Sequence, residues 1–201
     1  ALLATAALVS QHRGELKENA VFLFQPAEEG ELGAVKMIED GALEEPHVDR
    51  IFGFLFFPGI PAGKLAVREG PLMARATGLN LTIKGKSAHG AKPHLGNDAI
   101  VAAAQLVSML ETLISRRVDP MENAVLTIGT IAGGTRRNII CDEVSMTCTM
   151  RTFTDDVYET MMHGIRGMVK AVECAFDVTV TLAFEGPDYL AVVNDADLAE
   201  E

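Results

Sequence analysis

The chain has 201 residues, 48% of them apolar, which is enough for one large domain or two small ones with packed cores. Its 28 acidic and 17 basic side chains give a formal net charge of -11 at pH 7, which argues against nucleic acid or an anionic membrane surface as a partner. No apolar run approaches the length of a transmembrane helix.

The first 73 residues have the pattern of an α/β layer. The run Arg50–Phe57 is too uniformly apolar for a half-exposed strand and suits a central strand buried on both faces. Strands that alternate with helices are typical of α/β folds. We predict, in order, a buried helix over Ala1–Gln11, a strand over Val21–Phe24, a helix ending near Asp40-Gly41, a strand over Arg50–Phe57 and a short strand over Gly63–Glu69.

After Gly70-Pro71 the pattern changes, because apolar and polar residues now alternate as in strands with one buried face. Four such strands are predicted, and a loop over Gly85–Gly96 follows the first. Their apolar positions are Leu79, Leu81 and Ile83; Ala124–Ile131; Val144, Met146, Cys148 and Met150; and Val178, Val180, Leu182 and Phe184.

Two helices lie between these strands. Asn97 is a plausible N-cap for the first, and Arg116-Arg117 suit its C-terminal end. Thr154 opens the second, in which Gly164 and Gly167 each weaken the helix by roughly 1 kcal/mol relative to Ala. The second helix carries an apolar stripe at helical spacing: Val157, Met161, Ile165, Val169 and Val172.

The order β-α-β-β-α-β is the ferredoxin-like arrangement, with two helices on one face of a four-stranded antiparallel sheet. The predicted fold class is therefore α/β plus α+β: an α/β domain over residues 1–73, an inserted ferredoxin-like domain over 74–186, and a return to the first domain over 187–201. The chain has no initiator Met and stops within a helix-like segment, so we expect it to be a fragment of a longer protein.

Cysteine usage points to a reducing compartment. Cys141, Cys148 and Cys174 form neither a CxxC pair nor a paired disulfide framework, and free thiols in the cytoplasm are the simplest account. All three are interpreted as core or strand residues.

The adjacent carboxylates Glu28 and Glu29 follow the predicted strand Val21–Phe24, at its carboxyl end, where open α/β sheets keep their active sites. There, one carboxylate can hold a cation while the other moves protons. The alternative is a solvated acidic turn that opens a helix, where Glu favours the positive end of the helix dipole. These residues alone leave both interpretations open.

Three further residues could carry chemistry. His89, in a loop of small residues, could donate a hydrogen bond or act as a general acid, or it could be an idle surface imidazole. Asn138 follows a flexible basic turn that could present an amide or guanidinium to an anion, although such turns are most often plain hairpin loops. Arg151 ends a strand, and an exposed sheet position is its default reading.

Several separated stretches nevertheless match one pattern. They resemble the metal-dependent amidohydrolases and aminoacylases of metallopeptidase family 20, in order and along essentially the whole chain. The matching stretches are Phe24–Gly30, Gly41–Leu43, Ile51–Gly53, Pro61–Gly63, Gly85–His94, Ser115–Pro120, Asn138–Ile140 and Arg151–Phe153.

The resemblance implies a role for each site residue. Glu28 corresponds to the general base that activates water, and Glu29 to a ligand of a dinuclear zinc or manganese centre. The ferredoxin-like domain corresponds to a lid that makes the homodimer, and its His89 to the group that stabilises the oxyanion in the active site of the partner subunit. Asn138 and Arg151 match positions that bind the substrate carbonyl or carboxylate.

The chain also departs from the family. The family's aspartate motif and its Cys- or His-containing metal motif precede the first residue here, a further His lies beyond Glu201, and Leu55 occupies the place of another His. Of the expected ligands only Glu29 remains. We therefore expect a fragment of an amidohydrolase for N-acyl amino acids or related amides that has little activity by itself and does not retain its metals. The alternative is a non-catalytic dimerising or ligand-binding remnant.

Overall fold

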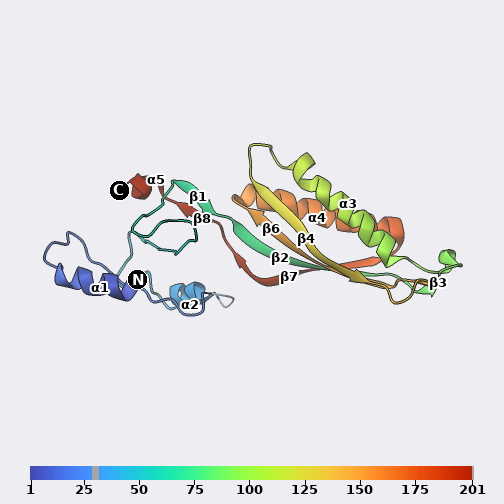
Figure 1. Cartoon of the computed structure of the whole chain (residues 1–201), viewed down its shortest axis with the longest axis horizontal. Helices are drawn as coiled ribbons and strands as arrows, with labels where there is room; N and C mark the ends of the chain where they lie inside the picture. The colour runs from blue at the N-terminus through green and yellow to red at the C-terminus, as the bar shows by residue number, and fades with distance from the viewer. Residues whose placement is uncertain (29–31, 201) are drawn as a thin grey trace. The chain divides into compact units, whose positions relative to one another are not determined.

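The computed structural model describes residues 1–28 and 32–200, which separate into two compact units, Ala1–Gly59 and Ile60–Glu201 (Figure 1). Each unit is described by itself. The domain boundaries expected at 73/74 and 186/187 stay predictions.

The second unit is built around one four-stranded sheet. Its strands are β2 (Arg75–Lys84), β4 (Ala124–Gly133), β6 (Glu143–Thr152) and β7 (Thr179–Tyr189). They lie in the order β4-β6-β2-β7, and each neighbouring pair is antiparallel. This is the predicted ferredoxin-like topology.

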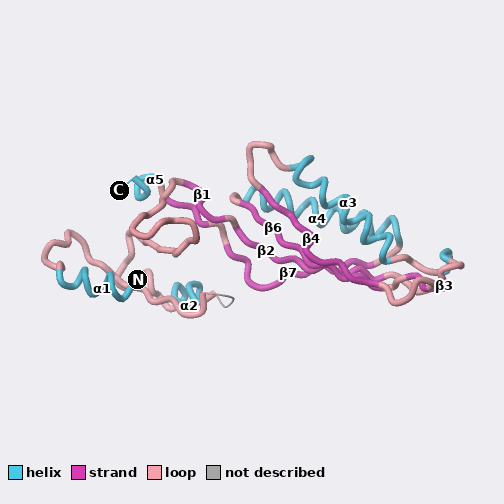
Figure 2. The backbone as a smooth tube through the Cα atoms, in the orientation of Figure 1, coloured by secondary structure: helices cyan, strands magenta, loops and turns pink. Residues whose placement is uncertain are grey.

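Two long helices, α3 (Ala99–Arg117) and α4 (Asp155–Phe176), cover one face of this sheet (Figure 2). The alternation in β2 and β6 turns every second side chain toward the helices, as predicted. The core therefore consists of strand residues such as Leu79, Leu81, Ile83, Val144, Met146 and Met150, together with the helix residues Leu106, Leu110, Leu113, Met161 and Ile165, all almost fully buried. The predicted stripe on α4 is buried along its whole length.

The predicted N-cap residue is correct for α4 and wrong for α3. Thr154 caps α4 by accepting a hydrogen bond from the Val157 N–H at 3.4 Å. The predicted cap Asn97 is wrong, because Asp98 accepts from the N–H groups of Ile100 at 2.9 Å and Val101 at 3.3 Å. Asn97 instead donates its amide to the backbone carbonyl of Asp177.

Shorter elements complete the unit. At one end of the sheet, β1 (Gly70–Met73) pairs with β8 (Val192–Asn194), and α5 (Ala196–Glu200) follows. At the other end, β3 (Ala88–His89) pairs with β5 (Ile139–Ile140), beside the 3₁₀ turn η1 (Pro93–Leu95).

The first unit differs most from expectation. Its helices are α1 (Leu2–Gln11) and α2 (Gly33–Glu39), and the predicted burial of α1 is wrong, since no residue of that helix is buried. The strands predicted over Val21–Phe24 and Arg50–Phe57 are absent from the described residues, as is the strand over Gly63–Glu69 at the start of the second unit. Phe54 and Phe56 are 73% and 85% exposed.

The reason is that a strand exists only when its backbone N–H and C=O groups pair with a neighbour. Residues 1–28 and 32–59 contain one isolated bridge, Glu44 to His47, and no ladder. The apolar residues indicate that these segments could be buried, but a segment becomes a strand only when a neighbouring strand is present to pair with it.

Two further expectations, on membrane-spanning length and on the cysteines, need correction. α3 is long and apolar enough to cross a membrane by length and composition, contrary to the expectation that no segment is; here its apolar stripe packs against α4 and the sheet. Cys141 and Cys148 are buried, as expected for core residues, and burial raises the pKa of the Cys148 thiol. The interpretation of Cys174 as a core or strand residue is wrong, because this thiol is exposed on the helix α4.

Candidate functional site

The short β3–β5 pair joins two of the predicted site residues. His89 pairs with Ile139, and the Gly90 N–H donates to the Asn138 carbonyl at 2.8 Å. A Cβ on Gly90 would lie 3.1 Å from the Asn138 carbonyl carbon and oxygen, so the glycine permits this close approach. His89 and Asn138, 49 positions apart in the sequence, therefore belong to one backbone-paired unit, and both are exposed.

The imidazole of His89 has a defined orientation. Its Nδ1 accepts a hydrogen bond from the Ala91 N–H at 3.1 Å. An accepting Nδ1 carries no proton, so in the neutral ring the proton resides on Nε2. The neutral ring of this exposed histidine thus has its N–H donor on Nε2, and an N–H donor is the kind of group that stabilises a developing oxyanion.

Arg151 lies elsewhere on the same unit. It stands on the polar face of β6, where its Nη1 donates to Thr149 Oγ1 at 2.6 Å and to the Met150 carbonyl at 3.0 Å. The β3–β5 end adjoins the start of β6 at Glu143, eight residues away, which is about 26 Å at about 3.3 Å per residue. Arg151 is therefore not brought together with His89 and Asn138 within one chain.

Glu28 belongs to the first unit, in an exposed turn that has at least one interaction with a neighbouring group. The Gly33 N–H donates to the Ala27 carbonyl at 3.4 Å, and a Cβ on Gly33 would lie 1.7 Å from the Pro26 oxygen, so only glycine fits there. Glu29, the predicted metal ligand, lies outside the described residues.

The donor set does not fit a metal centre. A catalytic zinc site takes three protein ligands of the His, Cys, Asp or Glu kind. Residues 1–28 and 32–200 contain no cluster of three such side chains that could hold an ion. Within the described residues, therefore, no three-ligand metal site is formed.

Sequence reasoning missed a partly buried charge cluster at the β1–β8 end of the sheet. Arg75 donates through Nε to both carboxylate oxygens of Asp188 at 3.1 Å and through Nη1 to Asp155 at 3.1 Å. Its guanidinium carbon lies 3.4 Å from the ring centroid of Tyr158, and Thr77 Oγ1 donates to Asp188 at 2.9 Å. No sequence signal links Arg75 to a residue 113 positions away.

The contacts in this cluster shift the pKa values of both Arg75 and Asp188. The hydrogen bond from Arg75 holds the pKa of Asp188 below its ordinary value, and the one to Asp188 raises the pKa of Arg75. Both shifts favour the charged pair, which marks the cluster as a structural tie between β2, β7 and α4.

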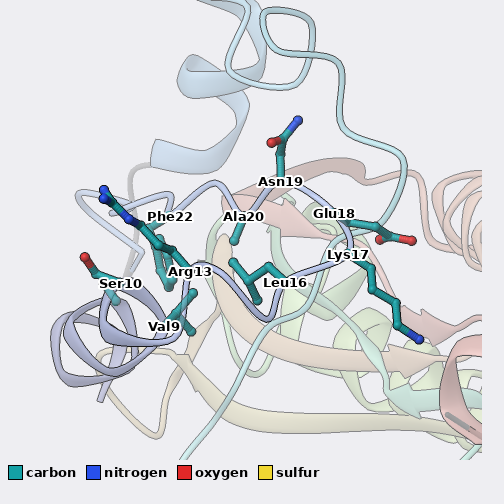
Figure 3. A pocket seen from close by; sticks show the side chains of 10 residues that line it. Val9, Ser10, Arg13, Leu16, Lys17, Glu18, Asn19, Ala20 and Phe22 are labelled. Carbon is teal, nitrogen blue, oxygen red and sulfur yellow. The ribbon is translucent and has the colours of Figure 1, made fainter.

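A hollow of about 550 Å³ lies in the first unit between α1 and the segment that follows it (Figure 3). Val9, Arg13, Leu16, Lys17, Asn19 and Phe22 are among its lining residues. None of the predicted site residues lines it, so it adds nothing to the site described above.

Comparison with known proteins places these features in a family. Residues 75–173 match the model of the M20 peptidase dimerisation domain. The chain is 39% identical to the N-acetyldiaminopimelate deacetylase of Priestia megaterium over 192 residues. This match covers 96% of the chain and 50% of that protein. The chain thus spans about half the length of the curated relatives it matches.

Solved structures agree. A Staphylococcus aureus protein superposes with a TM-score of 0.90 at 35% identity, over 98% of this chain and 52% of that one. The YXEP protein of Bacillus subtilis superposes with a TM-score of 0.77 at 32% identity, over 99% of this chain and 49% of that one. It is described as a dinuclear metal binding peptidase of the M20 family. The predicted fold class and family are thereby confirmed: this chain belongs to the M20 family of amidohydrolases and peptidases, and it carries that family's dimerisation domain.

Proposed function

We propose that the protein containing this chain hydrolyses the amide bond of N-acyl amino acids. The observation that carries the proposal is the hydrogen bond from the Ala91 N–H to Nδ1 of the exposed His89, which leaves Nε2 as the donor of the neutral ring, together with the backbone pairing that holds Asn138 next to it. The relatives named as N-acetyldiaminopimelate deacetylases support this class of substrate.

Each residue has a proposed task in that reaction. His89 donates Nε2–H to the oxyanion that forms when water adds to the amide carbonyl. Glu28 takes a proton from the attacking water, and Asn138 and Arg151 hold the carbonyl or carboxylate of the substrate. Since Arg151 is remote from His89 along β6, one chain does not present both groups to the same small substrate.

The metal is proposed for the whole protein and not for this chain. In the whole protein, two zinc or manganese ions per subunit would be bound by ligands that lie outside the described residues, and Glu29 would be one of these ligands. Metal analysis of the purified 201-residue chain should give well under one ion per chain. A stoichiometric, tightly held ion would contradict this.

We also propose a cytoplasmic homodimer built through the ferredoxin-like domain. β4 is an edge strand of the sheet, and Val125 and Ile131 on it are 49% and 57% exposed. An open edge of ten residues offers unpaired backbone groups to a second copy. Light scattering should detect a dimer, and a monomer at high concentration would count against this assembly.

The second candidate is a non-catalytic remnant of the family. Leu55 at the place of an expected His and the lack of a ligand cluster among the described residues favour it. Both candidates predict little hydrolysis by the 201-residue chain itself, so that measurement does not separate them.

The deciding assay measures amine release from N-acetyl amino acids, with added zinc or manganese, by the protein encoded with its flanking sequence. The amidohydrolase predicts turnover that falls about 10²–10³-fold in His89→Ala, the range for loss of an oxyanion donor. His163→Ala is the matched control, because His163 is an exposed histidine on α4. Absence of turnover in the longer protein would favour the remnant.

A further inference from the structure

Two neighbouring strands of the sheet continue beyond it as a two-stranded ribbon. Only Ala74 separates β1 from β2, and only residues 190–191 separate β7 from β8. β1 and β8 pair with each other in an antiparallel ladder. We call this pair the ribbon, and we call residue 74 together with residues 190–191 the joint. Figure 1 shows the ribbon projecting from the end of the sheet.

The ribbon has little other support within the second unit. Among the described elements, β1 and β8 contact each other extensively but have no comparable contact with α3, α4, β4 or β6. Leu72, Val192 and Val193 of the ribbon are exposed. The orientation of the ribbon relative to the sheet therefore depends on the groups that hold the two strands where they leave the sheet.

The sheet is irregular next to the joint. Ala76 of β2 pairs with Tyr189 of β7. The next pair in the ladder is Gly78 with Glu185, so one residue of β2 stands opposite three residues of β7. Gly186, within this bulge, has a φ of +70°, a region that favours glycine. Because a bulge interrupts the ladder and bends the strand, the backbone here can rotate more easily than in a regular sheet.

Arg75 connects this irregular region to its surroundings. It is the first residue of β2, and its guanidinium donates to Asp188 in the bulge and to Asp155 in the first turn of α4. The guanidinium also lies over the ring of Tyr158 of α4. Thr77, the residue opposite the bulge, donates to the same Asp188 carboxylate. One side chain thus links both strands that leave the sheet to the helix that covers it.

We propose that Arg75 holds the joint in one conformation, so that the ribbon, the sheet and α4 move as one body, and that the joint bends when its contacts with Asp188 and Tyr158 are removed. The Arg75 side chain is only 13% exposed, so water and salt screen its ion pair less than a fully exposed one. A guanidinium bound to both oxygens of a carboxylate also fixes the relative orientation of the two groups.

The position of Arg75 gives its contacts a long reach. β2 extends from Arg75 for ten residues, about 33 Å at about 3.3 Å per residue, to the end of the sheet that is followed by β3 and His89. A rotation of about 10° at the joint would displace that end by about 6 Å relative to the ribbon. Arg75 therefore fixes where the His89 end of the unit lies relative to the ribbon, whatever reaction the protein carries out.

The test measures the distribution of distances between two nitroxide labels in the 201-residue chain by pulsed electron paramagnetic resonance. One label is attached to the native Cys174, which is exposed on α4, and the other to Val193→Cys on β8. Cys141 and Cys148 are buried and should remain unlabelled. This pair of labels spans the joint, so its distance changes when the ribbon rotates relative to α4.

We expect one narrow distribution for the chain with Arg75 intact. Arg75→Met keeps a long side chain but loses the charge and all donors, and it should broaden or shift the distribution by about 6 Å, the displacement for a rotation of about 10°. Lys84→Met is the matched control, because it removes a basic residue of the same strand that pairs with Glu143 at 3.7 Å, far from the joint. An unchanged distribution in Arg75→Met, or equal broadening in Lys84→Met, would overturn the proposal.

A second pair of labels distinguishes bending at the joint from loosening of the whole unit. Cys174 and Thr127→Cys, an exposed position on β4, both lie on the sheet side of the joint. Their distance distribution should stay narrow in Arg75→Met, because the packing of α4 on the sheet does not depend on the joint. If this distribution broadens as much as that of the first pair, Arg75 stabilises the unit as a whole and the proposed role at the joint is wrong.

Discussion

The guanidinium of Arg75 on β2 and the carboxylate of Asp188 on β7 form a multiply hydrogen-bonded ion pair at the end of the sheet where β1 and β8 lie. Asp188 reaches Arg75 because residues 186–188 bulge from β7: Ala76 pairs with Tyr189, whereas Gly78 pairs with Glu185. The pair therefore closes an irregularity in the sheet and ties it to α4 through Tyr158 and Asp155.

Asp188→Asn should lower the free energy of unfolding by about 1–2 kcal/mol at pH 7, because Arg75, whose side chain is only 13% exposed, loses its main charged partner. Urea unfolding followed by tyrosine fluorescence suits this measurement. The chain has no Trp, and of its two tyrosines Tyr158 lies against Arg75 and Tyr189 pairs with Ala76.

The effect of Asp188→Asn should depend on pH in a defined direction. The pKa of Asp188 is lowered in the folded protein, so its stabilisation is fully present above the unfolded value of about 3.9 and is lost as pH falls through the folded value. The difference in the free energy of unfolding between wild type and variant should thus be constant near neutral pH and should disappear in acid. Glu143→Gln, which removes the exposed Lys84 pair, is the control and should change the free energy by less than about 0.5 kcal/mol. A gap that widened in acid would refute the assignment.

The two glycines of α4 should respond in opposite directions to alanine. A Cβ on Gly164 would lie 2.3 Å from Cδ1 of Leu113, a fully buried side chain of α3, whereas a Cβ on Gly167 would meet nothing within 4 Å. Gly164→Ala should destabilise by about 1–3 kcal/mol through overpacking. Gly167→Ala should stabilise by about 0.5–1 kcal/mol through helix propensity. Urea midpoints of the two variants check this, and equal shifts would show that helix propensity alone governs both sites.

These glycines also show what local pattern can predict. The sequence indicates the same helix penalty for Gly164 and Gly167, and only the packing of α3 on α4 separates them. In the same unit the alternation of Leu79, Leu81 and Ile83 predicts the right strand and the right buried face, because the partner strands are present in the chain.

The first unit shows the opposite case. The apolar run Arg50–Phe57 predicts a central strand, but periodicity describes one segment and not its neighbour, and among the described residues it has none to pair with. The Arg75–Asp188 tie could not be predicted for a similar reason, since a charge pair 113 residues apart leaves no local trace. His89 and Asn138 were singled out separately; their proximity came only with the β3–β5 pairing.

The start of α3 can be tested at a single residue. Asp98→Ala should destabilise the second unit by about 0.5–2 kcal/mol, because the N–H groups of Ile100 and Val101 lose their acceptor. Asp98→Asn retains a good capping side chain and should cost much less. Thermal and urea unfolding of the two variants give the comparison, and equal losses would mean that the carboxylate charge, and not the cap, stabilises the helix.

The tautomer of His89 gives the most direct check on the site. With Nδ1 accepting from Ala91 at 3.1 Å, the neutral imidazole should be the Nε2–H form, which ¹⁵N shifts and long-range couplings of the ring distinguish from the Nδ1–H form. Ala91→Pro removes that backbone donor and should allow a mixture of both tautomers. His163, exposed on α4 and far from the β3–β5 pair in sequence, is the internal reference in the same spectra and should not change. An Nδ1–H ring in the wild type would remove the Nε2–H donor on which the proposed oxyanion role of His89 depends.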